Sequence, residues 1–481
     1  MPALNKLDHV RAPLFEGVYH YQLSKPARLH VPGHKGHTFS GTEEEYYRMI
    51  HQIDVTEIPG LDDLHDPQEM IAEAQALAAD YFGADDTFFL VQGSTVGNLA
   101  LVLSACQRGD KIIVQRNAHQ SIIHGLMLAE AQAVFFHPTA WTKEGIGQLE
   151  QMCNIHSDAK AIFVTSPDYY GRTLELNILS RLAHRYQMLL FVDEAHGAHF
   201  KLHSKLPSTA LDCGADGVVQ STHKMLNSMT MTAMLHLKGE RVSKEIVRQQ
   251  LKMLQTSSPS YPLMASLDLS RRWAALHGVQ AVERTLNALQ AFRSGMKSKT
   301  WFNLESNQDP YKLCIADQTG TLDGFTLQRE LLERGCATEM ADPYCVIAAY
   351  SPAARENDLS ALESGLESIT QTYQLDERQL IDKNHHASSQ VKPHHGNQPW
   401  MTAPISFSRT SLNHPWEEVP WAQAHGRYAA EMIVPYPPGV PILFPGERID
   451  HSTLEQFNQW KRAGARFPGL NGRNLDRIRV W

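Results

Sequence analysis

Six short apolar runs, separated by stretches long enough for a helix, constrain the fold of this chain more than any other feature. Successive runs begin roughly 20 to 28 residues apart, as expected when crossover helices join parallel strands. Because the runs are nearly all apolar, both faces of their sheet should be covered. The pattern predicts a doubly wound α/β fold with a mostly parallel sheet. The runs are TFFLV (87–91), KIIVQ (111–115), AVFFH (133–137), AIFVT (161–165), LLFVD (189–193) and GVVQS (217–221).

The segments around these runs predict five parts. Residues 1–58 form an N-terminal arm, because HVPGHKGHTF is rich in residues that interrupt regular structure. Residues 59–300 form the large α/β domain, and 301–381 a smaller α/β domain. Residues 382–400 form a polar linker or surface loop with almost no apolar side chains. Residues 401–481 form a C-terminal segment with a helix and a Pro-rich stretch.

Composition excludes several classes of function. The formal net charge is -8 and no block of Lys or Arg occurs, so a nucleic-acid partner is not expected. No apolar run approaches the roughly 20 residues that span a bilayer, and no apolar signal segment follows Met1. The six cysteines form no C-x-x-C pair, which argues against a disulfide framework or a metal site and fits the reducing cytoplasm.

Polar residues follow four of the runs at the strand ends where open α/β sheets bind ligands. After TFFLV, the turn at Gly93, Ser94 and Thr95 leads into an apolar helix. Such a turn can cradle a phosphate with free N–H groups, or it can serve only as a helix N-cap. After KIIVQ, His119 is either a structural histidine or a ring that stacks on a planar ligand.

Two further strand ends carry a carboxylate and an amine. Asp193 ends LLFVD, where a buried carboxylate needs a cation or a donor; a loop cap or ion pair is the alternative. Lys224 follows GVVQS, flanked by the donors Ser221 and His223. Burial disfavours a charged amine, so Lys224 either reaches water or has a covalent partner.

These parts together suit pyridoxal 5′-phosphate. This cofactor needs a lysine for its Schiff base, a carboxylate at its ring nitrogen, an aromatic ring stacked on it and donors for its phosphate. Lys224, Asp193 and His119 would supply the first three, and Ser94, Thr95, Ser221 and His223 would supply the donors. Their order on successive strands makes the combination specific.

The chain resembles the ornithine/lysine/arginine decarboxylase family of fold type I pyridoxal-phosphate enzymes, in its shorter form without an N-terminal wing domain. The resemblance covers most of the length. It rests on VPGHKGHTF (31–39), EIPGLDDLHDP (57–67), FGADDTFFLVQGSTVGN (82–98), RNAHQS (116–121), DEAHGAHF (193–200), STHKML (221–226), TSSPSYPLMASLD (256–268) and VPYPPGVPILFPGE (434–447).

The resemblance implies a role for each matched residue. Lys224 is the Schiff-base lysine, His119 the stacking ring and Asp193 the partner of the ring nitrogen. Ser94, Thr95, Ser221 and His223 bind the phosphate end, and His196 of the D-E-A-H-G string belongs to the cofactor site. Thr256 is a phosphate contact supplied by the neighbouring subunit, so a homodimer with shared active sites, or a larger assembly, is implied.

A few positions depart from the family pattern. Gln120 stands where lysine is common, Asn227 and Ser228 where small or apolar residues are usual, and Thr232 where glycine or alanine is frequent. These positions flank the matched cofactor contacts. They bear on substrate choice more than on cofactor binding.

The implied reaction is decarboxylation of a basic amino acid in the cytoplasm, as in polyamine biosynthesis. Arginine is slightly favoured over lysine and ornithine, and the product is agmatine or a diamine. Glu57, Asp62 and Asp63 can bind the distal cation of the substrate or serve as loop caps. Two alternatives remain: another fold type I enzyme, such as an aminotransferase or oxoamine synthase, and a non-catalytic regulatory relative.

Overall fold

The computed structural model describes residues 7–37, 41–137, 142–377, 380, 400–408, 414–436, 439–470 and 475–481. The chain divides into two compact units. The first comprises residues 1–105 and 175–282, and the second comprises 106–174 and 283–481. The predicted linker at 382–400 lies outside the described residues, apart from Trp400. The five-part division of the chain remains a prediction.

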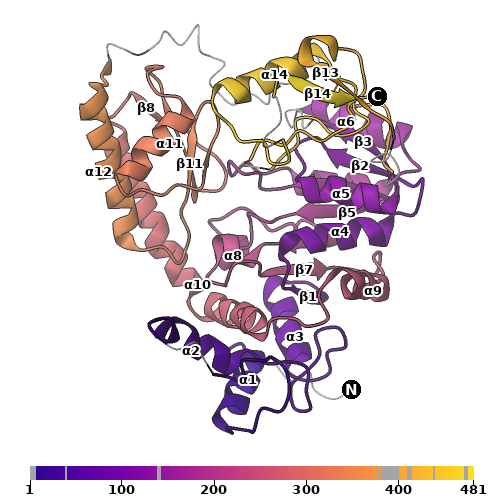
Figure 1. Cartoon of the computed structure of the whole chain (residues 1–481), viewed down its shortest axis with the longest axis vertical. Helices are drawn as coiled ribbons and strands as arrows, with labels where there is room; N and C mark the ends of the chain where they lie inside the picture. The colour runs from indigo at the N-terminus through magenta and orange to yellow at the C-terminus, as the bar shows by residue number, and fades with distance from the viewer. Residues whose placement is uncertain are drawn as a thin grey trace. The chain divides into compact units, whose positions relative to one another are not determined.

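The first unit holds four strands in the order β1-β7-β6-β5 (Figure 1). Strands β5 and β6 are parallel, whereas β7 runs antiparallel to both β6 and β1. Helix α4 packs against all four strands. The elements are α1 (Pro13–Leu23), α2 (Glu43–Ile53), α3 (Met70–Phe82), β1 (Asp86–Leu90), α4 (Gly93–Ala105), α7 (Leu176–Arg185), β5 (Leu189–Asp193), η1 (Phe200–Leu202), β6 (Gly217–Gln220), α8 (Thr222–Met225), β7 (Ala233–Leu237) and α9 (Lys244–Leu254).

The second unit holds the strand order β4-β2-β3-β12, and β2 pairs in parallel with both β3 and β4. A separate antiparallel sheet, β10-β11-β9-β8, packs against α11. The elements are β2 (Lys111–Gln115), α5 (Gln120–Ala129), β3 (Gln132–Phe136), α6 (Lys143–Ile155), β4 (Ala161–Thr165), β8 (Phe302–Leu304), β9 (Lys312–Asp317), α11 (Gly324–Glu333), β10 (Met340–Ala341), β11 (Val346–Ala349), α12 (Glu356–Tyr373) and β12 (Ile405–Ser406).

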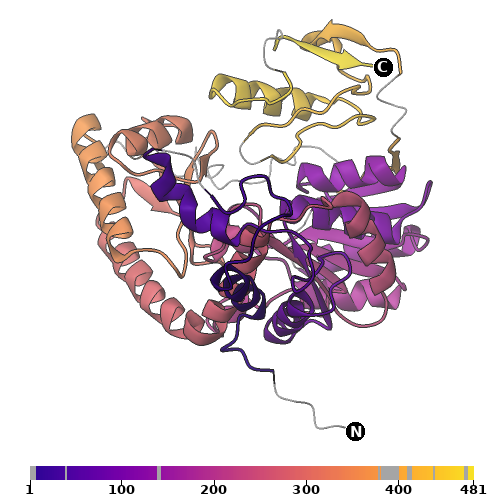
Figure 2. The same ribbon diagram turned by 60° about the horizontal axis from the view of Figure 1, so that its bottom comes forward.

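The C-terminal part of the second unit has its own small core. Strands β13 (Glu417–Pro420) and β14 (Arg477–Val480) form an antiparallel pair beside α14 (His451–Arg462), drawn in yellow in Figure 2. Trp421, in the 3-10 turn η4 (Trp421–Gln423), stacks on Phe457 of α14 at a centroid distance of 4.1 Å. A stacked aromatic pair buries a large apolar area, which anchors α14 to this pair of strands.

The long helix α10 (Tyr261–Met296) has 36 residues and belongs in part to each unit. None of the helices in the described ranges combines the length and the hydropathy that a bilayer-crossing segment needs.

Candidate active site

Lys224 lies on α8, a single helical turn that follows β6 directly. Its side chain is half-buried, and its Nζ lies 3.1 Å from Nε2 of the buried His196. The two nitrogens share at least one proton, because one must donate and the other must accept. The structure thus brings together the amine and the histidine that the sequence assigned to one cofactor site.

His223, next to the lysine, is held by the loop that follows. Its Nδ1 lies 2.8 Å from the carbonyl oxygen of Thr232, and its backbone N–H points to the same oxygen. A carbonyl only accepts, so Nδ1 carries the proton and Nε2 of a neutral His223 is an acceptor. Thr232 is itself buried, and its hydroxyl lies 2.6 Å from that of Ser228. Two positions that depart from the family pattern therefore build the support of His223.

Asp193 ends β5 and is almost fully buried, with 3% of its surface exposed. Its Oδ2 accepts a hydrogen bond from Nδ2 of Asn98, at 2.9 Å. Its Oδ1 accepts one from the backbone N–H of Ala195, at 3.1 Å. Asn98 is completely buried on α4. No spacing signal pointed to Asn98, although it closes the motif FGADDTFFLVQGSTVGN.

The predicted phosphate cradle lies at the start of α4. Gly93 has φ +75°, a conformation that L side chains rarely adopt, and a Cβ there would meet nothing within 4 Å. Its N–H donates to the carbonyl of Met231, in the loop after Lys224. Ser94 is half-buried and Thr95 exposed, and both lie in the first turn of α4, where backbone N–H groups lack helical acceptors.

Ser221 supplies the clearest test of whether a phosphate group fits here. It is fully buried directly before α8, and within the described part of the chain its Oγ has no hydrogen-bond partner. A buried hydroxyl without a hydrogen-bond partner destabilises a fold. The lack of a partner for Ser221 is explained if an oxygen of a bound ligand accepts a hydrogen bond from this hydroxyl. Together with the open turn at Gly93 and the amine of Lys224, it fits the donor set that pyridoxal phosphate needs.

His119 belongs to the second unit, where it is the N-cap of α5. Its Nδ1 accepts from the backbone N–H of Ser121 and lies 2.8 Å from the hydroxyl of Ser121. A Cβ at Gly439 would lie 3.4 Å from Nε2 of His119. The C-terminal segment therefore approaches the ring that the sequence assigned to cofactor stacking.

Arg116 joins the same C-terminal segment to the end of β2. Its guanidinium pairs with Glu447 at 2.9 Å, donates to the carbonyls of Pro441 and Ile442, and lies over the ring of Phe444. Burial raises the pKa of Glu447, an effect that the neighbouring guanidinium opposes. This pair was not predicted, because an arginine in a motif gives no sign of its distant partner.

Thr256 lies in an exposed loop after α9. Its backbone N–H donates to Oε1 of Gln92, at 3.2 Å, and its carbonyl lies 2.8 Å from Nε2 of His65. Gln92 directly precedes the Gly93 turn. The loop of one chain is thus attached to the start of that chain's own cradle.

The three acidic candidates for the substrate's distal cation differ in their surroundings. Asp63 accepts from the N–H of His65. Glu57 accepts from the hydroxyl of Thr56 through Oε2. The Asp62 carboxylate is buried and accepts five backbone N–H groups at 2.9 to 3.3 Å, from Asp63, Gln68, Glu69, Ile71 and Ala72.

For Asp62 these contacts support the loop-cap alternative, because its oxygens already have donors. Within the described residues, Oε1 of Glu57 is buried without a partner. Glu57 therefore remains a candidate, as does Asp63, for which only Oδ1 accepts a hydrogen bond among the described contacts.

A second chain of buried polar side chains begins at Glu194, the residue after Asp193, and crosses strands of the first unit. Glu194 accepts from Nε2 of Gln220, at 2.7 Å, and from the N–H of Ala210, at 2.8 Å. Oε1 of Gln220 lies 3.2 Å from His236, which lies 2.8 Å from the hydroxyl of Thr87. Burial raises the pKa of Glu194 to about 8 and lowers the pKa of His236 to about 3. Both side chains are therefore mostly uncharged at neutral pH.

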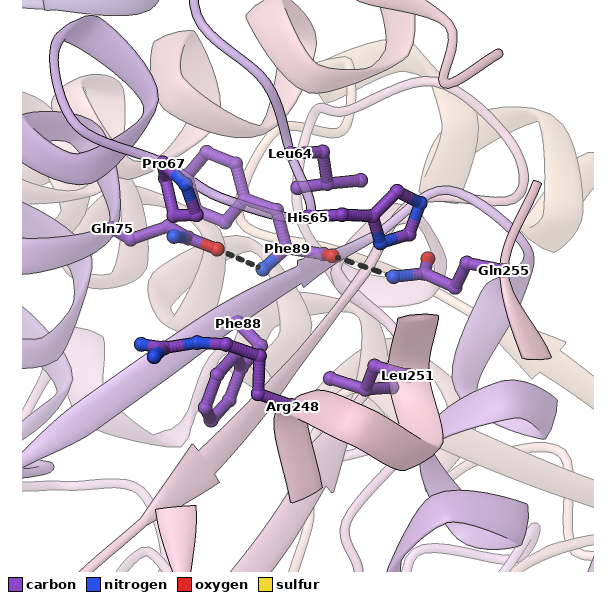
Figure 3. A pocket seen from close by; sticks show the side chains of 9 residues that line it. All are labelled: Leu64, His65, Pro67, Gln75, Phe88, Phe89, Arg248, Leu251 and Gln255. Carbon is purple, nitrogen blue, oxygen red and sulfur yellow. Dashed lines mark hydrogen bonds between the residues drawn. The ribbon is translucent and has the colours of Figure 1, made fainter. Parts of the chain in front are cut away.

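A small hollow lies at the outer edge of β1 (Figure 3). Oε1 of Gln75 accepts from the N–H of Phe89, and Nε2 of Gln255 donates to the carbonyl of Phe89. Arg248 and Phe88 line the hollow beneath them. None of the residues assigned to the cofactor lines it, so it is separate from the site around Lys224.

Comparison with known proteins identifies the family of this chain. Residues 12–308 match the family model of the Orn/Lys/Arg decarboxylase major domain, and residues 392–473 match the model of its C-terminal domain. The chain belongs to the ornithine/lysine/arginine decarboxylase family. It is therefore a carboxy-lyase that depends on pyridoxal phosphate, which agrees with the donor set around Lys224.

Relatives of the family match over nearly the whole chain. An arginine decarboxylase of Bacillus subtilis is 33% identical, covering 97% of both chains. An arginine decarboxylase of Bacillus anthracis is 31% identical, covering 99% of this chain and 98% of its own. The lysine decarboxylase LdcA of Pseudomonas aeruginosa is 24% identical, covering 98% of this chain and 78% of its own.

Solved structures confirm the fold class. Lysine decarboxylase A from Pseudomonas aeruginosa superposes with a TM-score of 0.78 at 20% identity, covering 98% of this chain and 80% of its own. A ureidoglycine–glyoxylate aminotransferase from Bacillus subtilis reaches 0.53 at 14% identity, covering 63% of this chain and 85% of its own. The predicted fold type I architecture is confirmed, and the decarboxylase match extends over far more of the chain than the aminotransferase match.

Proposed function

We propose that this decarboxylase acts on arginine and releases agmatine and carbon dioxide. The observation that carries the proposal is the near-complete match to relatives named arginine decarboxylase at 31 to 33% identity, against 22 to 24% for those named lysine decarboxylase. Agmatine is a polyamine precursor, so a role in polyamine biosynthesis follows. The six cysteines are all unpaired, which supports a cytoplasmic location.

We assign the cofactor contacts as follows. Lys224 would hold the aldehyde carbon covalently through Nζ, Asp193 would hold a proton on the ring nitrogen, and His119 would stack on the ring. Ser94, Thr95 and the unpartnered hydroxyl of Ser221 would donate to the phosphate. His223 would join them through Nε2 when that nitrogen also carries a proton. When bound, the cofactor supplies an electron-accepting ring that stabilises the charge left on Cα as carbon dioxide departs.

Residues of the chain would also manage the protons of the reaction. The amine of Lys224 is suited to return a proton to Cα, because His196, 3.1 Å away, can exchange protons with it. His223 is the other possible donor. To act as this donor, the ring would need a second proton on Nε2, since the proton on Nδ1 is already donated to the carbonyl of Thr232.

The product identifies the substrate. The purified protein with added cofactor is incubated separately with arginine, lysine and ornithine, and the amine formed is identified by mass spectrometry together with carbon dioxide release. We expect agmatine, with kcat/KM for arginine at least about tenfold above the others. Cadaverine or putrescine as the main product would contradict the assignment to arginine.

We also propose a homodimer in which Thr256 completes the neighbouring site. The N-terminal arm supports an interface, because α2 exposes Tyr46 and Met49, which are 76% and 64% exposed. Mixing two inactive variants, Lys224→Ala and Thr256→Glu, tests the shared site. If Thr256 acts across the interface, the mixed dimer regains one intact site and about a quarter of the activity returns.

If Thr256 instead serves its own chain, mixing the variants restores no activity, because each site in the mixed dimer then carries one of the two changes. Different affinity tags on the two variants, followed by purification on both tags in succession, show in either case whether mixed dimers have formed.

A further inference from the structure

We propose that Asn98 is a positioning residue that orients the Asp193 carboxylate by donating a hydrogen bond to it without neutralising its charge. The inference rests on the proposed role of Asp193 at the ring nitrogen of the cofactor. It adds a residue from the second turn of α4 to the assigned cofactor contacts.

The contacts of Asp193 fix its plane from two directions. The amide of Asn98 donates to Oδ2 at 2.9 Å, and the N–H of Ala195 donates to Oδ1 at 3.1 Å. Both Asn98 and Asp193 are buried, so water does not compete for these bonds. A carboxylate with one donor on each oxygen has a preferred orientation, and each donor stabilises its charged form.

The side chain that donates to Asp193 must be uncharged. An arginine or lysine in place of Asn98 would also stabilise the carboxylate, but it would cancel the negative charge that the ring cation needs. The amide of asparagine is neutral, so the net charge of the pair remains that of Asp193 alone. Asparagine therefore meets both requirements of this position, a donor and no added charge.

The backbone of α4 lies close enough to the strands for the short side chain of Asn98 to reach the carboxylate of Asp193. A Cβ on Gly97 would lie 2.8 Å from Cγ1 of Val219 in β6 and 2.9 Å from Cδ1 of Leu90 in β1. Even alanine at this position would push the helix away from the strands. Glycine at 97 thus allows the close approach on which the bond between Asn98 and Asp193 depends.

The same helix links both ends of the proposed cofactor site. Ser94 lies in the first turn of α4 and Asn98 in the next, about 6 Å farther along the axis at 1.5 Å per residue. One rigid element therefore carries a proposed phosphate donor and the donor that orients Asp193. A displacement of α4 should disturb both contacts together.

The test uses the holoenzyme of two variants, Asn98→Leu and Asn98→Asp, with Ser104→Ala on the same helix as the matched control. Without substrate, the visible absorption of the bound cofactor is titrated against pH; kcat and KM are measured separately with the best substrate. For Asn98→Leu we expect a titration midpoint about one pH unit lower, a kcat about 10- to 100-fold lower and a KM within about threefold of wild type. The control should behave as wild type.

Asn98→Asp keeps the shape of the side chain and covers the case in which Asn98→Leu does not fold. Two carboxyl groups at this distance share a proton, so the introduced carboxyl group can still donate to Asp193 while it is protonated. We expect the activity of this variant, relative to wild type, to recover as the pH falls. An unchanged absorption titration and kcat in Asn98→Leu, or a wild-type pH profile in Asn98→Asp, would overturn the proposal. Substrate choice is tested on the wild-type protein, so failure of the arginine assignment is distinguishable from failure here.

Discussion

The Nζ of Lys224 lies 3.1 Å from the Nε2 of His196. Two basic nitrogens at this distance, in a half-buried site, do not readily both carry their full complement of protons, because like charges repel and desolvation disfavours each. When the histidine is neutral, its unprotonated ring nitrogen can accept a hydrogen bond from the amine. This relationship explains how a lysine can occupy the space between two buried strands.

Replacing Lys224 with alanine should abolish covalent attachment of the cofactor. In the wild-type protein, borohydride should fix the cofactor to the peptide that contains Lys224. In Lys224→Ala neither fixation nor decarboxylation should be measurable, whereas Lys205→Ala, at an exposed position, should show both. Mass spectrometry of the digested protein identifies the labelled residue. Normal turnover by Lys224→Ala would contradict the assignment.

Ser221→Ala should separate cofactor binding from folding. Because Oγ of Ser221 has no partner within the described residues, its removal should leave the stability of the cofactor-free protein unchanged or raise it by about 1 kcal/mol. Loss of a donor to the phosphate should weaken cofactor affinity about 10- to 100-fold. Ser180→Ala is the control, since its hydroxyl bonds the carbonyl of Gly214: it should lose stability and keep cofactor affinity. If Ser221→Ala lowers the stability and leaves the cofactor affinity unchanged, the hydroxyl of Ser221 has only a structural role.

Glu194 should make the stability of the protein depend on pH. Burial raises its pKa to about 8 in the folded state, above the ordinary value of 4.5. Between these values the unfolded state loses the proton first, so the stability due to the protonated form declines as the pH rises, by up to about 1.4 kcal/mol per unit, and levels off above pH 8.

Glu194→Gln should remove this contribution, which urea unfolding at a series of pH values would measure. Glu240→Gln, at an exposed position, should keep the wild-type slope. Identical slopes for Glu194→Gln and wild type would mean that Glu194 is ionised in the folded protein.

Asp62→Ala should lower stability rather than alter substrate affinity. The carboxylate accepts five backbone N–H groups before and within the first turn of α3. Their loss should cost about 2 to 4 kcal/mol, which thermal or denaturant unfolding would detect. Asp63→Ala, which loses one backbone partner, should cost less. A normal melting temperature with a raised KM would instead show that Asp62 binds the distal cation of the substrate.

Strand positions could be predicted closely from the sequence. The runs at 111–115, 161–165 and 189–193 coincide with β2, β4 and β5, because fully buried strands are short apolar runs with polar or turn residues at their ends. Helix α3 ends at Phe82, before Gly83, whose left-handed conformation is typical of a glycine at the end of a helix. The pairing of β1 could not be predicted, since its partner β7 is antiparallel and lies far along the chain.

The candidate site shows a similar division. Lys224, Asp193 and Ser221 could be chosen as candidates because each ends or directly follows a recognisable strand and carries a group that a cofactor needs. Asn98 could not, because an asparagine inside a helix has no periodic signal and its partner is 95 residues away. The bond between Arg116 and Glu447 spans 331 residues and is equally invisible to spacing arguments.

Two glutamines occupy backbone hydrogen-bonding groups of β1, the outer strand of its sheet. An outer strand with free N–H and C=O groups is a template on which an extended segment of another molecule can assemble. Here the side-chain amides of Gln75 and Gln255 occupy the groups of Phe89, and Gln255 also accepts from the N–H of Val91. The amide of each side chain has an N–H donor and a C=O acceptor, as a peptide unit has. It is attached to a flexible side chain and not to a backbone, so no further strand can continue from it. A strand of another molecule that approached this edge would therefore meet backbone groups that are already bonded.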